Sequence, residues 1–90
     1  MGKDSNNINE VKRRMLYRSR RGMLELDLLL VPFVENRFEN LASAQQQLVE
    51  QLLNLEDIEL HELIQRPERR PEFQEIIELI VQYRQQQSSL

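Results

Sequence analysis

The apolar run at residues 28–34 (LLLVPFV) constrains the fold more than any other part of this sequence. A helix that is apolar on every side is stable only where neighbouring elements cover it. Met23 and Leu26 extend the apolar pattern toward the N-terminus at helical spacing. We therefore expect a central, buried helix here, which Pro32 kinks or divides because proline lacks a backbone N–H. A buried strand over residues 28–31 is the less favoured alternative, since the surrounding composition is helical.

Start signals indicate helices before and after this central segment. Asn7 with Glu10 three residues later has the arrangement of a capping box, and an apolar stripe at helical spacing follows it. Ser43 with Gln46 repeats the arrangement before the leucine-rich segment at residues 44–55. We expect a first helix after Asn7, a short connection at residues 19–21, and a third helix from Ser43.

Two further helices are indicated by charges and prolines. The pair Glu56-Asp57 suits the start of a fourth helix, because acidic side chains favour the positive end of the helix dipole. Pro67 should end that helix, since the residue before a proline avoids helical angles. Pro71 suits the first turn of a fifth helix, which continues with apolar residues at helical spacing.

Length and composition support one helical domain. The chain has 90 residues with only two glycines and three prolines, and Leu, Glu, Gln and Arg dominate it. These four residue types are good helix formers, and a chain of this size builds one small core. We predict an all-α, small five-helix bundle in a single domain at residues 8–85. Residues 1–7 and 86–90 are predicted to be a flexible N-terminus and a flexible tail.

The residues that could support catalysis are few. The chain has no cysteine and one histidine, His61, which we interpret as a surface or rim residue of the fourth helix. No P-loop or glycine-rich dinucleotide motif is present, and the pair Glu56-Asp57 reads as helix-start charge rather than as a general acid and base. We predict that the protein is not an enzyme, with no catalytic and no metal-binding residues.

The pattern of apolar residues bears on membrane insertion and on where the protein resides. The longest apolar run has seven residues, too few to span a bilayer, and the first residues lack the apolar region of a secretory signal. We expect no membrane insertion and a cytoplasmic location.

Residues 1–24 have a net charge of +5 and residues 25–90 a net charge of −8, so the two parts favour different partners. The basic segment at residues 12–21 could contact phosphates, but the acidic remainder favours a solvated helix face or a protein partner.

The short motif Arg21-Gly22-x-x-Glu25 lies where the basic segment meets the apolar run. If a helix begins at Gly22, Arg21 and Glu25 are neighbours one turn apart, and spacing alone favours a surface ion pair of about 0.3–0.5 kcal/mol. The alternative is that Gly22 removes side-chain bulk so that a partner can approach, while Arg21 offers its planar guanidinium to that partner. Gly22 itself is either the left-handed stop of the first helix or the first position of the second.

The motif, followed by Leu26-Asp27 and then by Pro32-Phe33, resembles the small bacterial and mitochondrial FAD assembly factors of succinate dehydrogenase. The resemblance extends over residues 10–84 and includes the acidic start of the fourth helix at Glu56-Asp57. The sequence departs from the family at Ile58 and Leu63, where relatives often have proline and tryptophan.

This resemblance implies a function for the protein. Members of the family bind the flavoprotein subunit of succinate dehydrogenase, and in bacteria that of fumarate reductase, and promote covalent attachment of FAD to a histidine of that subunit. It implies partner-binding roles for Arg21, Gly22, Glu25 and Asp27. FAD would be attached to the partner, with no cofactor bound stably by this protein, which we expect to be a monomer. The alternatives are an antitoxin-like interaction module and a nucleic-acid-binding helical domain, although we expect no nucleic acid as partner.

Overall fold

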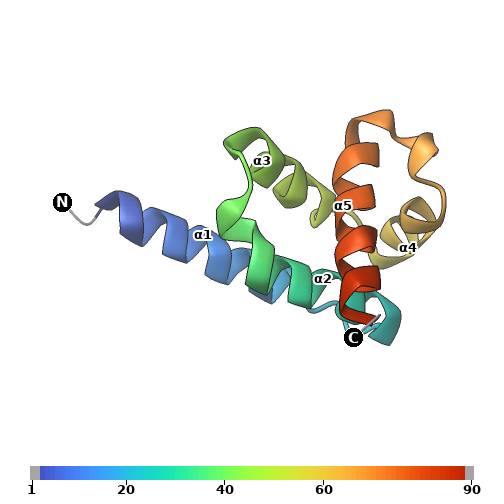
Figure 1. Cartoon of the computed structure of the whole chain (residues 1–90), viewed down its shortest axis with the longest axis horizontal. Helices are drawn as coiled ribbons and strands as arrows, with labels where there is room; N and C mark the ends of the chain where they lie inside the picture. Colours follow the sequence, from blue (N-terminus) through green and yellow to red (C-terminus); the bar gives the residue numbers. More distant parts are fainter. Residues whose placement is uncertain (1–2, 89–90) are drawn as a thin grey trace.

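The chain folds into a bundle of short helices (Figure 1). The computed structural model describes residues 3–88, and side chains are described for residues 8–87. Over this part of the chain five α-helices and two 3-10 helices occur and no strand: α1 (Lys3–Ser19), α2 (Leu24–Arg37), η1 (Phe38–Asn40), α3 (Ser43–Leu52), α4 (Asp57–Gln65), η2 (Pro67–Arg69) and α5 (Pro71–Ser88). The predicted all-α five-helix fold is confirmed.

The helices are arranged around α2 and α5. In Figure 1, α1 and α2 lie side by side, α5 crosses α2, and α3 and α4 lie on opposite sides of α5. The start of α1 extends away from the rest of the bundle, whereas its last turns pack against α2. All of these helices contribute to one core, which consists of Met15, Leu26, Leu30, Phe33, Val34, Phe38, Val49, Leu52, Leu53, Leu60, Leu63, Phe73, Ile76, Ile77, Ile80 and Tyr83.

The central helix α2 is buried on one side only. Leu26, Leu30 and Phe33 are at most 3% exposed, but Leu28 is 40% and Leu24 is 72% exposed. The expected central helix is present and has a buried side, but Leu28 is exposed although residues 28–34 are apolar almost all round. Helices α1 and α5 pack against α2, and a chain of this length has too few elements to cover the remaining side. The uncovered apolar side lies directly after the Arg21-Gly22 motif.

Pro32 does not divide α2, which runs without interruption from Leu24 to Arg37. A proline at this position removes one hydrogen bond, to the carbonyl of Leu28. Both residues lie on the partly exposed side of α2, where water can take the place of the missing N–H. Of the two predicted effects of Pro32, division of the helix is wrong, and a kink stays a prediction.

The helix starts agree with the sequence pattern to different degrees. Helix α4 begins after Glu56 and ends before Pro67, and Pro71 opens α5, as predicted. Helix α3 begins one residue earlier than a Ser43 cap requires, because Ala42 is the cap residue and its N–H donates to Gln45 Oε1 at 3.0 Å. Helix α1 begins at Lys3, so the predicted cap at Asn7 lies inside a helix.

The termini were predicted to be flexible at residues 1–7 and 86–90. Helices α1 and α5 extend into both segments, to Lys3 and to Ser88. Residues 1, 2, 89 and 90 lie outside the described residues. The flexibility of the two termini stays a prediction, as does the domain range of residues 8–85.

Candidate functional site

Residues 20–23 link α1 to α2 and contain Arg21 and Gly22, whereas Glu25 lies in the first turn of α2. Gly22 has φ of +84°, the one positive φ among the described residues. A Cβ atom at this position would meet nothing within 4 Å, so glycine is required by backbone conformation and not by lack of space. Gly22 is exposed, and α2 begins two residues later, at Leu24. Of the two interpretations of Gly22, the structure supports the left-handed position between two helices.

The Arg21 side chain points inward, and only 12% of it is exposed. Its Nε donates to Asp57 Oδ1 at 2.8 Å, and Nη1 donates to the carbonyl oxygens of Arg18 at 3.0 Å and Leu53 at 2.7 Å. Nη2 donates to the carbonyl oxygen of Leu55. The expected pair with Glu25 does not form, because the chain is not helical between Arg21 and Met23 and the guanidinium turns toward the start of α4.

Asp27 holds the backbone of the same residue. Its Oδ1 accepts a hydrogen bond from the Arg21 backbone N–H at 2.7 Å, and its own N–H donates to the carbonyl oxygen of Met23. A carboxylate in the first turn of α2 also interacts favourably with the positive end of the helix dipole. Asp27 therefore fixes the link from the side of α2, while the Arg21 side chain fixes it from the side of α4.

Glu25 is the outward-facing charge of the motif. Its side chain is 76% exposed, and its Oε1 lies 3.2 Å from His61 Nε2 on α4, whose side chain is 31% exposed. Such an exposed pair contributes about 0–1 kcal/mol, so another charged or polar group can replace it at little cost. Glu25 is accessible to a partner, in contrast to Arg21.

The sequence analysis missed two residues of this site, Asp57 and His61. Asp57 contacts Arg21 and His61 contacts Glu25, in each case across 36 positions of the chain. Asp57 was interpreted only as a helix-start charge, and His61 only as a rim residue. No spacing within a single helix relates either residue to the motif, so no signal of local periodicity could have found them.

Large hydrophobic side chains lie exposed around the link. They are Tyr17 at the end of α1, Leu24 and Leu28 on α2, and Ile58 on α4, with exposures of 80%, 72%, 40% and 74%. Two shallow hollows lie among them, one lined by Tyr17, Arg18, Arg20, Arg21 and Asp57, the other by Arg20, Gly22, Asp27, Leu28, Val31 and Pro32. Exposed apolar groups next to a polar motif are typical of a protein-interaction surface.

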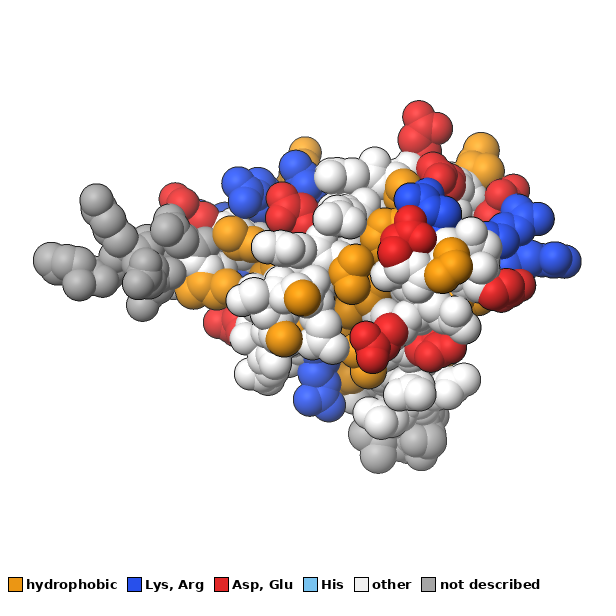
Figure 2. Space-filling model, turned by 90° about the horizontal axis from the view of Figure 1, so that it is seen from above, with side chains coloured by type: hydrophobic (Ala, Val, Ile, Leu, Met, Phe, Trp, Pro, Cys, Tyr) orange, Lys and Arg blue, Asp and Glu red, His pale blue; other side chains and the backbone are white. Residues whose placement is uncertain are grey.

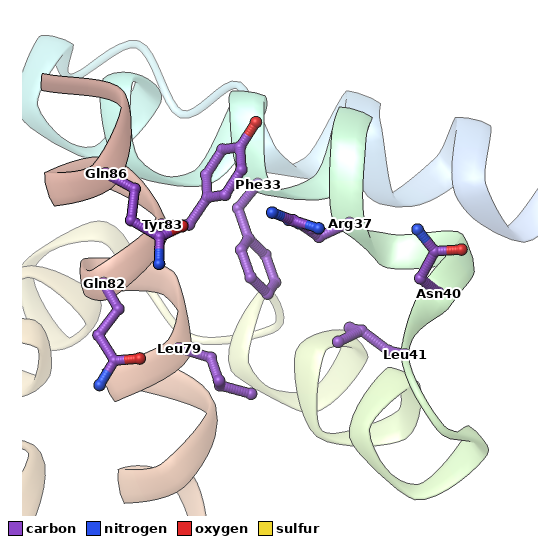
Figure 3. A pocket seen from close by; sticks show the side chains of 8 residues that line it. All are labelled: Phe33, Arg37, Asn40, Leu41, Leu79, Gln82, Tyr83 and Gln86. Atoms are coloured by element: carbon purple, nitrogen blue, oxygen red, sulfur yellow. The ribbon is translucent and has the colours of Figure 1, made fainter. Parts of the chain in front are cut away.

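A separate pocket lies between the second half of α2, the start of the η1–α3 connection and the last turns of α5 (Figure 3). It has a volume of about 290 Å³ and is lined by Phe33, Arg37, Asn40, Leu41, Leu79, Gln82, Tyr83 and Gln86. The Arg37 guanidinium lies 5.1 Å from the centre of the Tyr83 ring, and Asn36 Nδ2 donates to the Tyr83 hydroxyl at 2.7 Å. Phe33 meets the same ring edge-on at 6.0 Å. These contacts pack α2 against α5, away from the motif.

The remaining surface carries charges of both signs. Figure 2 shows one face on which Lys and Arg side chains are interspersed with Asp and Glu. On α1, Lys12 Nζ lies 2.7 Å from Glu39 Oε1. Within residues 3–88 no helix combines the length and apolar character needed to cross a membrane, and no three His, Asp or Glu side chains of the described part gather as a metal-binding group.

Fold and site together define a class: a small all-helical bundle that displays a glycine-centred link and an exposed glutamate on its surface. A family model described as "Flavinator of succinate dehydrogenase" matches residues 13–84. The chain therefore belongs to this family, and the resemblance noted in the sequence is confirmed. The matched range includes the motif as well as Asp57 and His61.

Similar curated proteins carry the name FAD assembly factor SdhE. The protein of Pseudomonas putida is 39% identical over 70 residues, which cover 76% of this chain and 83% of the relative. That of Legionella pneumophila is 40% identical over 73 residues, covering 80% and 92%. That of Aliivibrio fischeri is 45% identical over 51 residues, covering 57% and 59%. No solved structure gives a significant match.

Proposed function

We propose that this protein is an assembly factor that binds the flavoprotein subunit of succinate dehydrogenase and promotes covalent attachment of FAD to it. The flavoprotein of fumarate reductase is proposed as a second client. Membership of the family and the names of the relatives support this function. The observation that carries it in this chain is the display of the motif: Gly22 is exposed, and the Glu25 side chain is 76% exposed.

The three motif residues and Asp27 have different roles in the proposed binding. Gly22 and Glu25 form the outward edge, while Arg21 and Asp27 hold the link from within through their hydrogen bonds. The exposed Leu24 adds an apolar contact to this edge. Aromatic and apolar anchors next to a few polar groups are the usual composition of a protein-binding surface.

The protein is proposed to act as a chaperone and not as an enzyme. It would bind the immature flavoprotein preferentially in the conformation that juxtaposes the flavin with its acceptor histidine, and so raise the population of that conformation. Attachment then proceeds with groups of the flavoprotein itself, and the acceleration comes from positioning. FAD becomes covalently attached to the partner, and this protein binds no cofactor stably. We propose that it works in the cytoplasm as a monomer.

The test is to co-express the flavoprotein subunit with wild-type protein, with Glu25→Ala and with Gly22→Arg. Both variants should lower covalent flavin attachment, measured as in-gel flavin fluorescence, because a central contact contributes about 2 kcal/mol or roughly thirtyfold in affinity. Glu35→Ala is the matched control, since Glu35 is also exposed and also on α2. Fluorescence equal to wild type for both motif variants would sink the assignment of these residues.

Nucleic-acid binding is not part of the proposal. The exposed Arg13 and Arg14 belong to an otherwise acidic molecule, and Lys12 is paired with Glu39. Titration with duplex DNA at low salt, where phosphate contacts are strongest, should give no binding. An antitoxin-like module would be distinguished by the protein recovered with this chain in a pull-down.

A further inference from the structure

The Arg21 side chain already donates four hydrogen bonds within this protein. A guanidinium has five N–H donors in a planar fork, and here Nε, Nη1 and Nη2 all donate to acceptors of the same chain. The side chain is 12% exposed. A partner would have to break these hydrogen bonds to bind the guanidinium. Because that costs free energy, direct contact with the partner is the less favoured role for Arg21.

The acceptors of Arg21 come from three separate segments. One is the carbonyl of Arg18 in the last turn of α1, where helix carbonyls lack partners within the helix. Two are the carbonyls of Leu53 and Leu55 in the connection between α3 and α4. The fourth acceptor is Asp57, the first residue of α4. Arg21 thus joins the end of α1 to the connection and to the start of α4.

The backbone of Arg21 is held as well, through the hydrogen bond from its N–H to Asp27 on α2. The next residue along the chain is Gly22, in its left-handed conformation. The position of the exposed edge relative to α4 therefore depends on contacts made one residue before it. Because Glu25 also reaches α4, through His61, the edge and α4 form one surface only while this arrangement is intact.

We propose that Arg21 and Asp57 are positioning residues for the partner-binding edge, and that the partner contacts are made by the outer residues Gly22 and Glu25. Asp57 lies outside the motif, and neither the motif nor the family description assigns it a role. We call the set of Arg21, Asp57 and Asp27 the link lock. The identity of the partner in this inference rests on the proposed function. The effect of the link lock on the free protein is independent of that function.

Positioning and contact differ in what they do to binding kinetics. Without the link lock, the edge is in its binding conformation for a smaller fraction of the time. The apparent affinity is the intrinsic affinity multiplied by that fraction. If that fraction is about one tenth, the apparent association rate falls about tenfold while the dissociation rate stays unchanged. Loss of a contact residue instead raises the dissociation rate, where most effects of interface substitutions lie.

The experiment compares Asp57→Ala, Asp57→Asn and Arg21→Lys with two matched controls. Glu56→Ala removes the same charge one residue earlier, where the side chain makes no cap hydrogen bond, and Arg14→Lys makes the same change at an exposed arginine of α1 that lines neither hollow. Hydrogen exchange of the amides at residues 20–24 is measured in the free protein. Association and dissociation rates are measured with the purified flavoprotein subunit of succinate dehydrogenase carrying non-covalent FAD.

We expect Asp57→Ala and Arg21→Lys to speed exchange of the Arg21 amide, and to slow association about tenfold without changing dissociation. Asp57→Asn keeps an oxygen that can accept from Arg21 Nε, so it should retain most of the wild-type behaviour, and the controls should retain all of it. Faster dissociation with unchanged exchange would show that Arg21 and Asp57 contact the partner, which overturns the proposal. Lower melting temperature with unchanged exchange and rates at 25 °C would overturn it in favour of a purely structural role.

Failure of the proposed function can be told apart from failure of this inference. If the wild-type protein does not bind the flavoprotein, the proposed function is wrong, whatever the variants do. The exchange measurement needs no partner. Unchanged protection of residues 20–24 in both Asp57→Ala and Arg21→Lys would overturn the link lock even if the wild-type protein binds.

Discussion

Arg21 and Gly22 are neighbours in the sequence, but different physical requirements select them. Gly22 is needed for a backbone angle of +84° with open space around it, and a glycine between two helical patterns could be read from the sequence. Arg21 is needed for hydrogen bonds to segments 32–36 residues away. Its partners could not be predicted, because only the folded chain brings the start of α4 next to the link. The sequence drew attention to both residues, whose partner-binding roles stay a prediction, but it did not reveal the inward contacts of Arg21.

Substitutions of Gly22 should separate the effect of backbone conformation from the effect of side-chain size. Gly22→Ala should lower the free energy of unfolding by about 1–2 kcal/mol, because an L-residue pays that amount in the left-handed region. Gly22→Asn should lose less, since asparagine tolerates this region better. Urea denaturation monitored by circular dichroism measures both. An alanine variant as stable as wild type would mean that the link changes conformation freely.

Helix α2 shows which structural features the helical spacing of apolar residues can predict and which it cannot. The spacing of apolar residues correctly placed a helix there, and three residues of this pattern, Leu26, Leu30 and Phe33, belong to the core. The pattern is apolar on nearly all sides, so it could not reveal which side stays uncovered. That depends on the packing of α1 and α5, which bury one side and leave Leu24 and Leu28 exposed. The helix ends set by Pro67 and Pro71 were predictable because proline acts through local sterics.

The two sides of α2 can be compared by truncating one leucine on each. Leu30 is 1% exposed, and Leu30→Ala should destabilise the protein by about 2–5 kcal/mol through lost burial and the cavity left behind. Leu28 is 40% exposed, so Leu28→Ala should cost clearly less, about 1 kcal/mol. Chemical denaturation of both variants measures the difference. Equal losses would mean that the outer side of α2 is covered by something in solution.

For the whole molecule, the main finding is where the apolar surface lies. The four large hydrophobic residues exposed in the described part belong to the end of α1, the start of α2 and the start of α4. Arg21 joins these three elements through its hydrogen bonds to Arg18, Asp27 and Asp57. A bundle of this size has spare apolar residues, but chance would scatter them singly. Tyr17 and Leu28 each line a hollow beside the link, and Leu24 lies one helical turn before Leu28 on α2, so we expect the proposed binding surface to be larger than the motif.

This larger surface leads to a prediction for Leu24 and Ile58, which are 72% and 74% exposed. Because neither side chain is buried in the free protein, Leu24→Ala and Ile58→Ala should leave the free energy of unfolding within about 0.5 kcal/mol of wild type. Each should nevertheless weaken binding of the flavoprotein subunit by more than about 1 kcal/mol, or roughly fivefold or more, if it becomes buried at the centre of the interface. Calorimetric titration of the purified partners measures the affinity, and Gln51→Ala, an exposed position on α3, is the control. Full affinity in both variants would restrict the interface to the polar edge of Gly22 and Glu25.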